Sequence, residues 1–174
     1  AGATFAGQHD TFPNVLGEES LWCHLKQVWA SLWTERAIHY ASALRLPIVQ
    51  MKMAVIVQEL IPAHVSGVAF TLDPITGDSN KLLVSAAFGL GESTVSGAVN
   101  PDNVLLKRNP TTIIRYSVGK KQSKIEINPA GGTLSIDLPD HQSKQSCLSK
   151  AQCVQIAKMA LTIESEFNNI PQDI

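Results

Sequence analysis

The sequence predicts an α+β fold in which helices flank a sheet of mixed or antiparallel strands. Helical periodicity covers residues 18–46, and a second helical segment begins at Ser149. Between them, residues 53–137 contain a succession of short apolar runs separated by turns. Because helices and strands do not alternate, this order favours α+β over a chain of parallel βαβ units.

The first 17 residues are rich in glycine and small polar residues, so we expect a loop. From Glu18 onward the pattern is that of an amphipathic helix. Its apolar stripe recurs at helical spacing: Leu21, Leu25, Val28 and Leu32. Thr34 is a candidate N-cap for a continuation to Ala43. Three tryptophans flank the stripe, and their spacing favours core filling over a ligand box: Trp22, Trp29 and Trp33.

Seven apolar runs predict the strands of the sheet. They are residues 53–57, 67–72, 81–87, 104–107, 112–118, 124–127 and 133–137. Residues 138–148 are polar, and we expect a loop. The last helix starts with Ser149 and Gln152 in the arrangement of a capping box. Its expected buried face consists of Cys153, Ile156, Ala157, Ala160, Leu161, Ile163 and Phe167.

Composition excludes several classes of protein. A formal net charge of −1 argues against a chain that mainly grips nucleic acid or an anionic membrane surface. No apolar run is long enough to span a bilayer, and the first residues lack the basic start of a signal peptide. Three cysteines are few and odd in number, which does not suit a disulfide framework and favours a reducing, cytosol-like compartment. Because the chain does not begin with Met, we expect it to be a piece of a longer protein.

Several familiar catalytic motifs are absent. Residues 119–122 lack the glycine spacing and the Ser/Thr of a P-loop, and no Gly-x-Ser-x-Gly occurs. The five histidines have no metal-ligand spacing with the cysteines, so no residue is assigned to a metal. A hydrolytic triad stays open, although nothing in the sequence points to one.

Three stretches with glycine or strand-end character remain as candidate ligand sites. Residues 5–11 are either a loop that folds over phosphate oxygens or an ordinary surface loop. Residues 55–62 are either a segment that offers main-chain groups to a purine edge or an ordinary strand end, which is the more frequent case. Residues 89–93 contain a lone Gly-x-Gly, which is weak evidence for a dinucleotide site.

The order of these stretches is more informative than any one of them. The ordered segments are Phe5–Thr11, Trp29–Ala37, Val55–Gln58, Ser66–Thr71, Gly89–Glu92, Ser96–Gly97 with Pro101–Asp102, and Pro171–Ile174. This series resembles the nucleotide-binding domain of the phosphoenolpyruvate synthase and pyruvate phosphate dikinase family, in its phosphoenolpyruvate synthase and rifampicin phosphotransferase branch. Residues 109–148 match that pattern only loosely.

The resemblance implies an ATP-grasp fold, in which two α+β lobes hold ATP between them, of which this chain is a central part. It further implies that ATP is split with Mg²⁺ and that a phosphoryl group passes to a histidine on a swivelling domain. That domain delivers it to pyruvate or to a hydroxyl acceptor. The partners implied are therefore ATP, the phosphohistidine domain and an acceptor-binding domain outside this chain.

Residue by residue, Gly7 and Thr11 match the loop that covers the phosphates, which we assign to residues 1–17. Gln58, Glu59 and Ile61 match the segment that holds adenine, the latter two through main-chain groups.

Two further residues match the family's functional positions. Glu92 matches an acid that contacts the ribose or a metal-bound water. Arg36 matches an arginine that assists phosphate binding as a catalytic residue, but an ion pair with Glu35 or another neighbour on the helix surface is an equal alternative.

Other functional residues of the family have no counterpart here. Its phosphate-binding lysine and an arginine precede the point where this sequence begins, and its metal-binding glutamate follows a Gln-Asp-Ile segment such as Gln172–Ile174. Glu164 and Glu166 lie on the preceding helix and need not replace it. We therefore expect the 174-residue chain alone not to cleave ATP.

Two other interpretations stay open. The chain is alternatively a non-catalytic nucleotide-binding or scaffold module that retains the fold, or an unrelated α+β protein with chance motifs. Flanking sequence with the missing lysine, arginine and glutamate favours the enzyme over the module.

Overall fold

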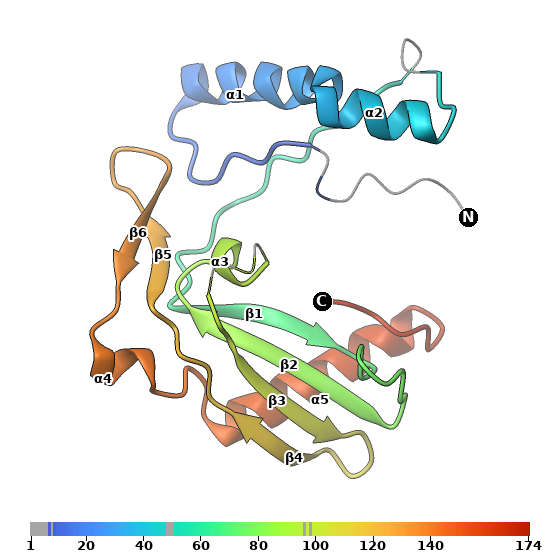
Figure 1. Cartoon of the computed structure of the whole chain (residues 1–174), viewed down its shortest axis with the longest axis vertical. Helices are drawn as coiled ribbons and strands as arrows, with labels where there is room; N and C mark the ends of the chain where they lie inside the picture. Colours follow the sequence, from blue (N-terminus) through green and yellow to red (C-terminus); the bar gives the residue numbers. More distant parts are fainter. Residues whose placement is uncertain (1–6, 8, 48–50, 96, 98) are drawn as a thin grey trace. The chain divides into compact units, whose positions relative to one another are not determined.

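The computed structural model of this chain describes Gly7, residues 9–47, residues 51–95, Gly97 and residues 99–174. The chain divides into two compact units (Figure 1). Unit 1 comprises residues 1–61 with 127–133, and unit 2 comprises residues 62–126 with 134–174. The predictions that concern residues 1–6, Gln8 and Ser96 lie outside the described residues.

Unit 1 contains the predicted N-terminal helices, α1 (Glu18–Ala30) and α2 (Glu35–Ala43), joined by the 3₁₀ turn η1 (Ser31–Trp33). The predicted cap is confirmed: the Thr34 hydroxyl accepts a hydrogen bond from the Ala37 N–H at 3.4 Å. A threonine at this position satisfies one of the free N–H groups of the first helical turn. It therefore lets α2 restart directly after the tight turn.

The prediction that the three tryptophans fill a core is wrong in this chain. Trp22, Trp29 and Trp33 are 55%, 45% and 54% exposed. The leucine and valine stripe is half-buried as expected, but the indoles lie beside it. Only the Trp29 indole N–H has a described main-chain partner, the Met53 carbonyl at 3.2 Å. A helical stripe therefore located the inner face of α1, but bulky neighbours of that stripe stay outside it.

The strand predicted at residues 53–57 is also wrong. Residues 51–63 lie in neither a helix nor a strand, so the sheet region begins at Val65 and not at residue 53. An apolar run becomes a strand only when another strand supplies its hydrogen-bond partners. Among the described residues, no segment pairs with this one.

Unit 2 is built on a four-stranded antiparallel sheet in the order β1-β2-β3-β4. The strands are β1 (Val65–Phe70), β2 (Lys81–Phe88), β3 (Asp102–Lys107) and β4 (Thr112–Ser117). Strands β5 (Ser123–Ile127) and β6 (Thr133–Asp137) form a separate two-stranded pair. Six of the seven predicted strands are thus confirmed, with ends that differ by at most two residues.

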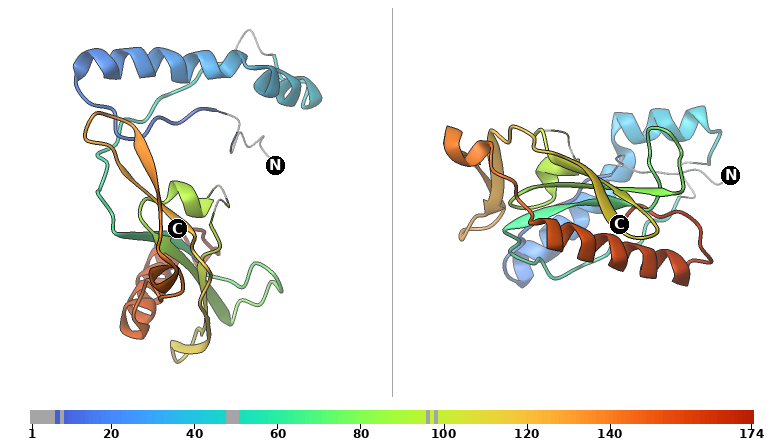
Figure 2. Two further views of the ribbon diagram at one scale, coloured as in Figure 1. Left: turned by 60° about the vertical axis from the view of Figure 1, so that its left-hand side comes forward. Right: turned by 90° about the horizontal axis from the view of Figure 1, so that it is seen from below.

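Helix α5 (Lys150–Glu166) covers one face of this sheet (Figure 2). The predicted capping box is present, since Ser149 and Gln152 each bond the other's main chain. The core between helix and sheet includes Leu82, Val84, Val104, Leu106, Cys153, Ala157 and Ala160. The predicted face is wrong at its end, because Phe167 is 56% exposed whereas Glu164 is buried.

Two short helices complete unit 2: α3 (Glu92–Val95) and α4 (Asp140–Ser143). Helix α4 corrects the expectation that residues 138–148 are all loop. The C-terminal tail returns to β1, where Ala69 and Ile174 exchange two main-chain hydrogen bonds of 2.8 and 3.0 Å. Because β2 occupies the other side of β1, the tail lies on the outer edge of the sheet. In the described part of the chain, no helix is both long and apolar enough to cross a membrane.

Candidate functional site

The loop before α1 is anchored on both sides of Thr11. The Asp10 N–H donates to the Ser31 hydroxyl at 3.2 Å, and the Phe12 ring lies 4.8 Å from the His24 ring. Thr11 itself is exposed, and Gly7 is exposed with a φ of +70° that favours glycine. The loop therefore presents a hydroxyl to solvent from a fixed position.

Arg36 lies against this loop. Its guanidinium Nη2 is 3.9 Å from the Asp10 carboxylate, with both side chains about half exposed (57% and 48%). The Glu35 carboxylate, which was the alternative partner of Arg36, instead lies 3.6 Å from Nε2 of the His39 imidazole. The structure thus brings Arg36 together with the loop that carries Gly7 and Thr11.

The predicted adenine segment is exposed. Gln58 and Glu59 are exposed, and the Ile61 side chain is 66% exposed. Because the segment belongs to no helix or sheet, its main-chain groups are not committed to a hydrogen-bond ladder. That freedom is what main-chain recognition of a purine edge requires.

A cavity of about 370 Å³ lies in the same unit. Its lining residues are His9, Leu32, Leu46, Pro47, Met51, Lys52 and Met53. His9 belongs to the anchored loop, and Met53 lies five residues before Gln58. None of the seven site residues predicted from the sequence lines it.

Glu92 belongs to unit 2, where it is the exposed first residue of α3. The backbone geometry before Glu92 explains why a glycine is found at position 89. Gly89 has a φ of +82°, and a Cβ there would lie 2.3 Å from the Ile125 carbonyl oxygen. The Leu90 N–H donates to that same oxygen at 2.8 Å. This approach of β5 to the end of β2 holds the start of α3.

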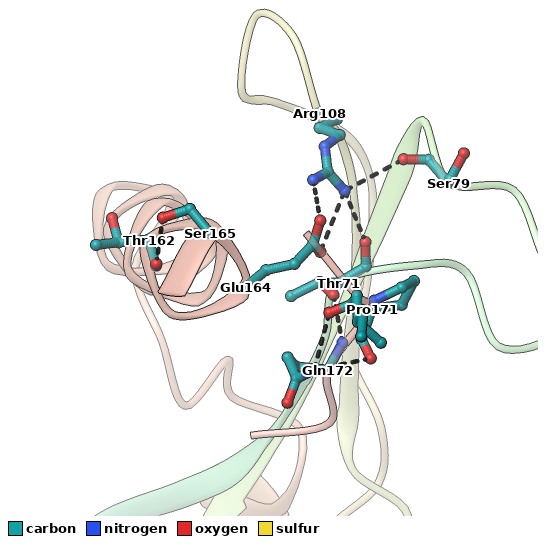
Figure 3. A network of polar contacts seen from close by, with 9 residues as sticks. Thr71, Ser79, Arg108, Thr162, Glu164, Ser165, Pro171 and Gln172 are labelled. Atoms are coloured by element: carbon teal, nitrogen blue, oxygen red, sulfur yellow. Dashed lines mark hydrogen bonds and ion pairs between the residues drawn. The ribbon is translucent and has the colours of Figure 1, made fainter. Parts of the chain in front are cut away.

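A group of four residues in unit 2 was not anticipated as a site (Figure 3). We call it the Thr71 cluster: Thr71, Arg108, Glu164 and Gln172. The Gln172 N–H donates to the Thr71 hydroxyl oxygen at 2.7 Å, and the Thr71 N–H donates to the Gln172 carbonyl at 3.0 Å. Arg108 donates to the Glu164 carboxylate and also to the main-chain oxygens of Thr71 and Ser79, at 3.2 and 3.4 Å.

Glu164 stays ionised in this cluster although it is 2% exposed. Burial alone would raise the pKa of Glu164, but hydrogen bonds from Arg108 and from the Thr71 hydroxyl hold the pKa below its ordinary value. The sequence does contain a signal for this residue. Glu164 follows Ala157 and Ala160 at helical spacing, so it extends the buried stripe of α5.

A second buried network surrounds Asp102. Its carboxylate accepts hydrogen bonds from Lys121, from the Gly119 N–H at 3.0 Å and from the Cys147 N–H at 2.8 Å. The Tyr116 hydroxyl donates to the same carboxylate at 3.2 Å. Pro101–Asp102 belongs to the ordered series of segments in the sequence, but the sequence alone indicated no role for Asp102.

A metal site built only from side chains is not found among the described residues. Among them, no group of three or more His, Cys, Asp or Glu side chains is placed to hold a metal ion. Mg²⁺ is a hard cation that, at nucleotide sites, is usually bound by one or two carboxylates together with the substrate phosphates.

Comparison with known proteins confirms the family indicated by the ordered motifs. Residues 1–174 match the family described as the pyruvate phosphate dikinase AMP/ATP-binding domain. The chain is 38% identical over 172 residues to rifampicin phosphotransferase of Streptomyces sviceus, covering 99% of this chain and 20% of that protein. It is 33% identical over 178 residues to phosphoenolpyruvate synthase of Pyrococcus furiosus, covering 99% of this chain and 22% of that protein.

The chain therefore spans about a fifth of the length of these relatives. The family match nevertheless covers all of the given chain, residues 1–174. This chain belongs to the pyruvate phosphate dikinase AMP/ATP-binding domain family.

Proposed function

We propose that this chain is the ATP-binding part of a longer phosphotransferase of the phosphoenolpyruvate synthase type, with an ATP-grasp fold. The match of residues 1–174 to an AMP/ATP-binding domain carries this proposal. The whole protein would split ATP and pass a phosphoryl group to a histidine domain, and then to pyruvate or a hydroxyl acceptor. Phosphoryl transfer depends mainly on positioning and charge neutralisation, so the roles of individual residues follow from where they lie.

The loop around Gly7 and Thr11 would cover the phosphates, with Arg36 as a cationic contact. The position of Arg36 supports this role, because its guanidinium lies 3.9 Å from the carboxylate of Asp10 on that loop. A phosphate group carries more charge than one carboxylate and accepts bidentate hydrogen bonds from a guanidinium. Bound ATP would therefore compete effectively with Asp10 for Arg36.

The segment Gln58–Ile61 would hold the adenine through main-chain groups, and Glu92 would contact the ribose. The absence of a strand at residues 51–63 supports the first role, since these groups are open to a ligand. The resemblance implies Mg²⁺ as well. No ligand set for this ion is assembled by the described side chains alone, and we derive no step through the metal.

Calorimetric titration of ATP into the whole protein that contains this chain tests the proposal. Ile61→Pro removes one main-chain donor and is expected to weaken ATP binding by about 1–3 kcal/mol, the cost of a lost buried hydrogen bond. Ile61→Val keeps the N–H group and serves as the matched control, with affinity near that of the unaltered protein.

Two results would count against different parts of the proposal. No ATP binding by the unaltered protein would overturn the function itself. Unchanged affinity in Ile61→Pro would overturn only the adenine assignment. ATP binding without release of AMP and phosphate would favour a non-catalytic module over a phosphotransferase.

A further inference from the structure

The loop that carries Thr11 is bonded at Asn14 to a turn far along the chain. This turn, within residues 127–133, belongs to the same compact unit as residues 1–61. The Asn14 side-chain amide donates to the carbonyl of Asn128 at 2.6 Å and to the carbonyl of Gly132 at 2.7 Å. The Gly132 N–H donates to the Asn14 carbonyl at 3.0 Å. Hydrogen bonds in both directions therefore join the loop to the turn.

The turn itself (residues 128–132, between β5 and β6 in Figure 1) is closed by its own hydrogen bonds. The Asn128 N–H donates to the Gly132 carbonyl at 3.0 Å, and the Gly131 N–H donates to the Asn128 carbonyl at 2.9 Å. The Asn128 side-chain oxygen accepts from the Ala130 N–H at 3.0 Å. The two carbonyls that Asn14 bonds therefore point in fixed directions. An asparagine amide suits this pair because its NH₂ group carries two donors.

Asparagine also suits the backbone conformation at position 14. Asn14 has a φ of +53°, in the left-handed region where asparagine and aspartate are several-fold enriched over other residues with a side chain. Aspartate would tolerate this φ but would place an oxygen against the two carbonyls of the turn. Glycine would tolerate it but has no side-chain donor. These two replacements therefore remove the donors without adding backbone strain.

The hydrogen bonds of Asn14 complete the anchoring of the loop around Thr11. Before Thr11, the Asp10 N–H donates to the Ser31 hydroxyl at 3.2 Å, and the Asp10 carboxylate lies 3.9 Å from the Arg36 guanidinium. After Thr11, the loop is held at Asn14. The exposed Thr11 thus lies between two anchored residues of the same unit. Neither Asn14 nor the turn belongs to the ordered series of segments, and the roles proposed above use neither of them.

We propose that Asn14 is a positioning residue for binding of the triphosphate, because its hydrogen bonds to residues 128–132 hold the loop of Thr11 in one conformation. This inference rests on the function proposed above, in which that loop covers the phosphates. A loop that adopts its binding conformation only part of the time lowers the apparent affinity by that fraction. Loss of the Asn14 amide therefore weakens binding of ATP, whereas adenosine has no phosphate for the loop to cover.

Calorimetric titrations of ATP and of adenosine into the whole protein test the inference with Asn14→Asp. If the loop keeps its binding conformation about a tenth of the time, the Kd for ATP rises about 10-fold. We expect the Kd for adenosine to change less than about two-fold. Asn168→Asp is the matched control, because Asn168 is exposed and has a similar φ of +57°. It makes the same chemical change at the same backbone conformation and should leave both affinities unaltered.

Amide hydrogen exchange provides a second readout that needs no nucleotide. The Gly132 N–H, which bonds the Asn14 carbonyl, is expected to exchange faster in Asn14→Asp than in the unaltered protein or in Asn168→Asp. If Asn14→Asp does not fold, Asn14→Gly removes the same donors without adding a charge. The Kd for ATP is then expected to rise in Asn14→Gly, again with little change for adenosine.

Unchanged affinity for ATP in the folded Asn14 variant would overturn the inference. An equal loss of affinity for ATP and for adenosine would overturn it as well, since Asn14 would then support the unit in general and not the loop over the phosphates. Unchanged exchange at Gly132 would show that the Asn14 amide does not hold the loop to the turn. If the unaltered protein itself binds no ATP, the proposed function fails, and that result is seen before any variant is compared.

Discussion

The ammonium group of Lys121 and the carboxylate of Asp102 form an ion pair in which neither side chain is exposed to solvent. The same carboxylate bonds Gly119, Tyr116 and Cys147, so it joins the start of β3, the segment after β4 and the segment before α5. Burial raises the pKa of Asp102, but hydrogen bonds from Lys121 and Cys147 outweigh it and hold the pKa below its ordinary value. A buried carboxylate with this many donors is ionised in the folded protein.

Asp102→Asn is expected to destabilise the fold by about 3–5 kcal/mol at neutral pH, because Lys121 loses its buried counter-charge. The folded pKa of Asp102 lies below the unfolded value of about 3.9, so its contribution is complete above about pH 5 and is lost as pH falls through the folded pKa. Urea unfolding at several pH values should therefore show the difference between Asp102→Asn and the unaltered chain shrinking below pH 5. The exposed Asp137→Asn is the control. A difference that stays constant down to pH 3 would contradict the assignment.

Arg108→Met is expected to cost about 3 kcal/mol of stability, because it leaves the Glu164 carboxylate buried without its partner. The double variant Arg108→Met, Glu164→Met removes both charges and should recover most of that loss. Chemical denaturation of the two variants measures the difference. A double variant no more stable than the single one would show that the other hydrogen bonds of Arg108, and not the charge of Glu164, dominate the loss.

The three cysteines are expected to differ in reactivity toward an alkylating reagent at pH 8. Burial, with Asp102 beside the thiol, raises the pKa of Cys147 to about 12, and burial also raises the pKa of Cys153. The reactive species is the thiolate, so both should resist labelling in the folded chain. Cys23 is exposed and should react first. Mass spectrometry after a short pulse checks this order, with Cys23→Ser as the control. Rapid labelling of Cys147 in the folded chain would show that the network around Asp102 opens.

Gly89→Ala and Gly77→Ala separate two costs of replacing a glycine. Both positions have positive φ, +82° and +72°, which disfavours alanine by about 1–2 kcal/mol. Only at Gly89 would the new Cβ also meet a main-chain atom, the Ile125 oxygen, whereas nothing lies within 4 Å at Gly77. Gly89→Ala should therefore lower the free energy of unfolding by about 1–3 kcal/mol more than Gly77→Ala does. Thermal or urea unfolding measures the difference. Equal losses would mean that β5 moves away from Gly89 without cost.

Features of the fold that depend on nearby residues could be predicted from the sequence. The Ser149–Gln152 capping box, the Thr34 cap and six of the seven strands all follow from spacing and turn chemistry within a few residues. The family also followed from the sequence, because ordered motifs are a property of the chain and need no folded structure. The predicted loop and Arg36 do lie together, but that contact is between Asp10 and Arg36, which spacing alone did not identify.

Features that depend on partners far along the chain could not be predicted in this way, because they arise when the chain folds. Residues 53–57 have strand-like composition but no strand beside them, and the tryptophans of α1 fall beside its inner stripe and not on it. Helical spacing places Glu164 on the buried stripe of α5 but does not identify its partner Arg108, 56 residues earlier. In the same way, the Thr71 hydroxyl meets the Gln172 N–H across 101 residues. Burial and hydrogen bonding are set by all the segments that meet at one point, so a periodic pattern in one segment cannot specify them.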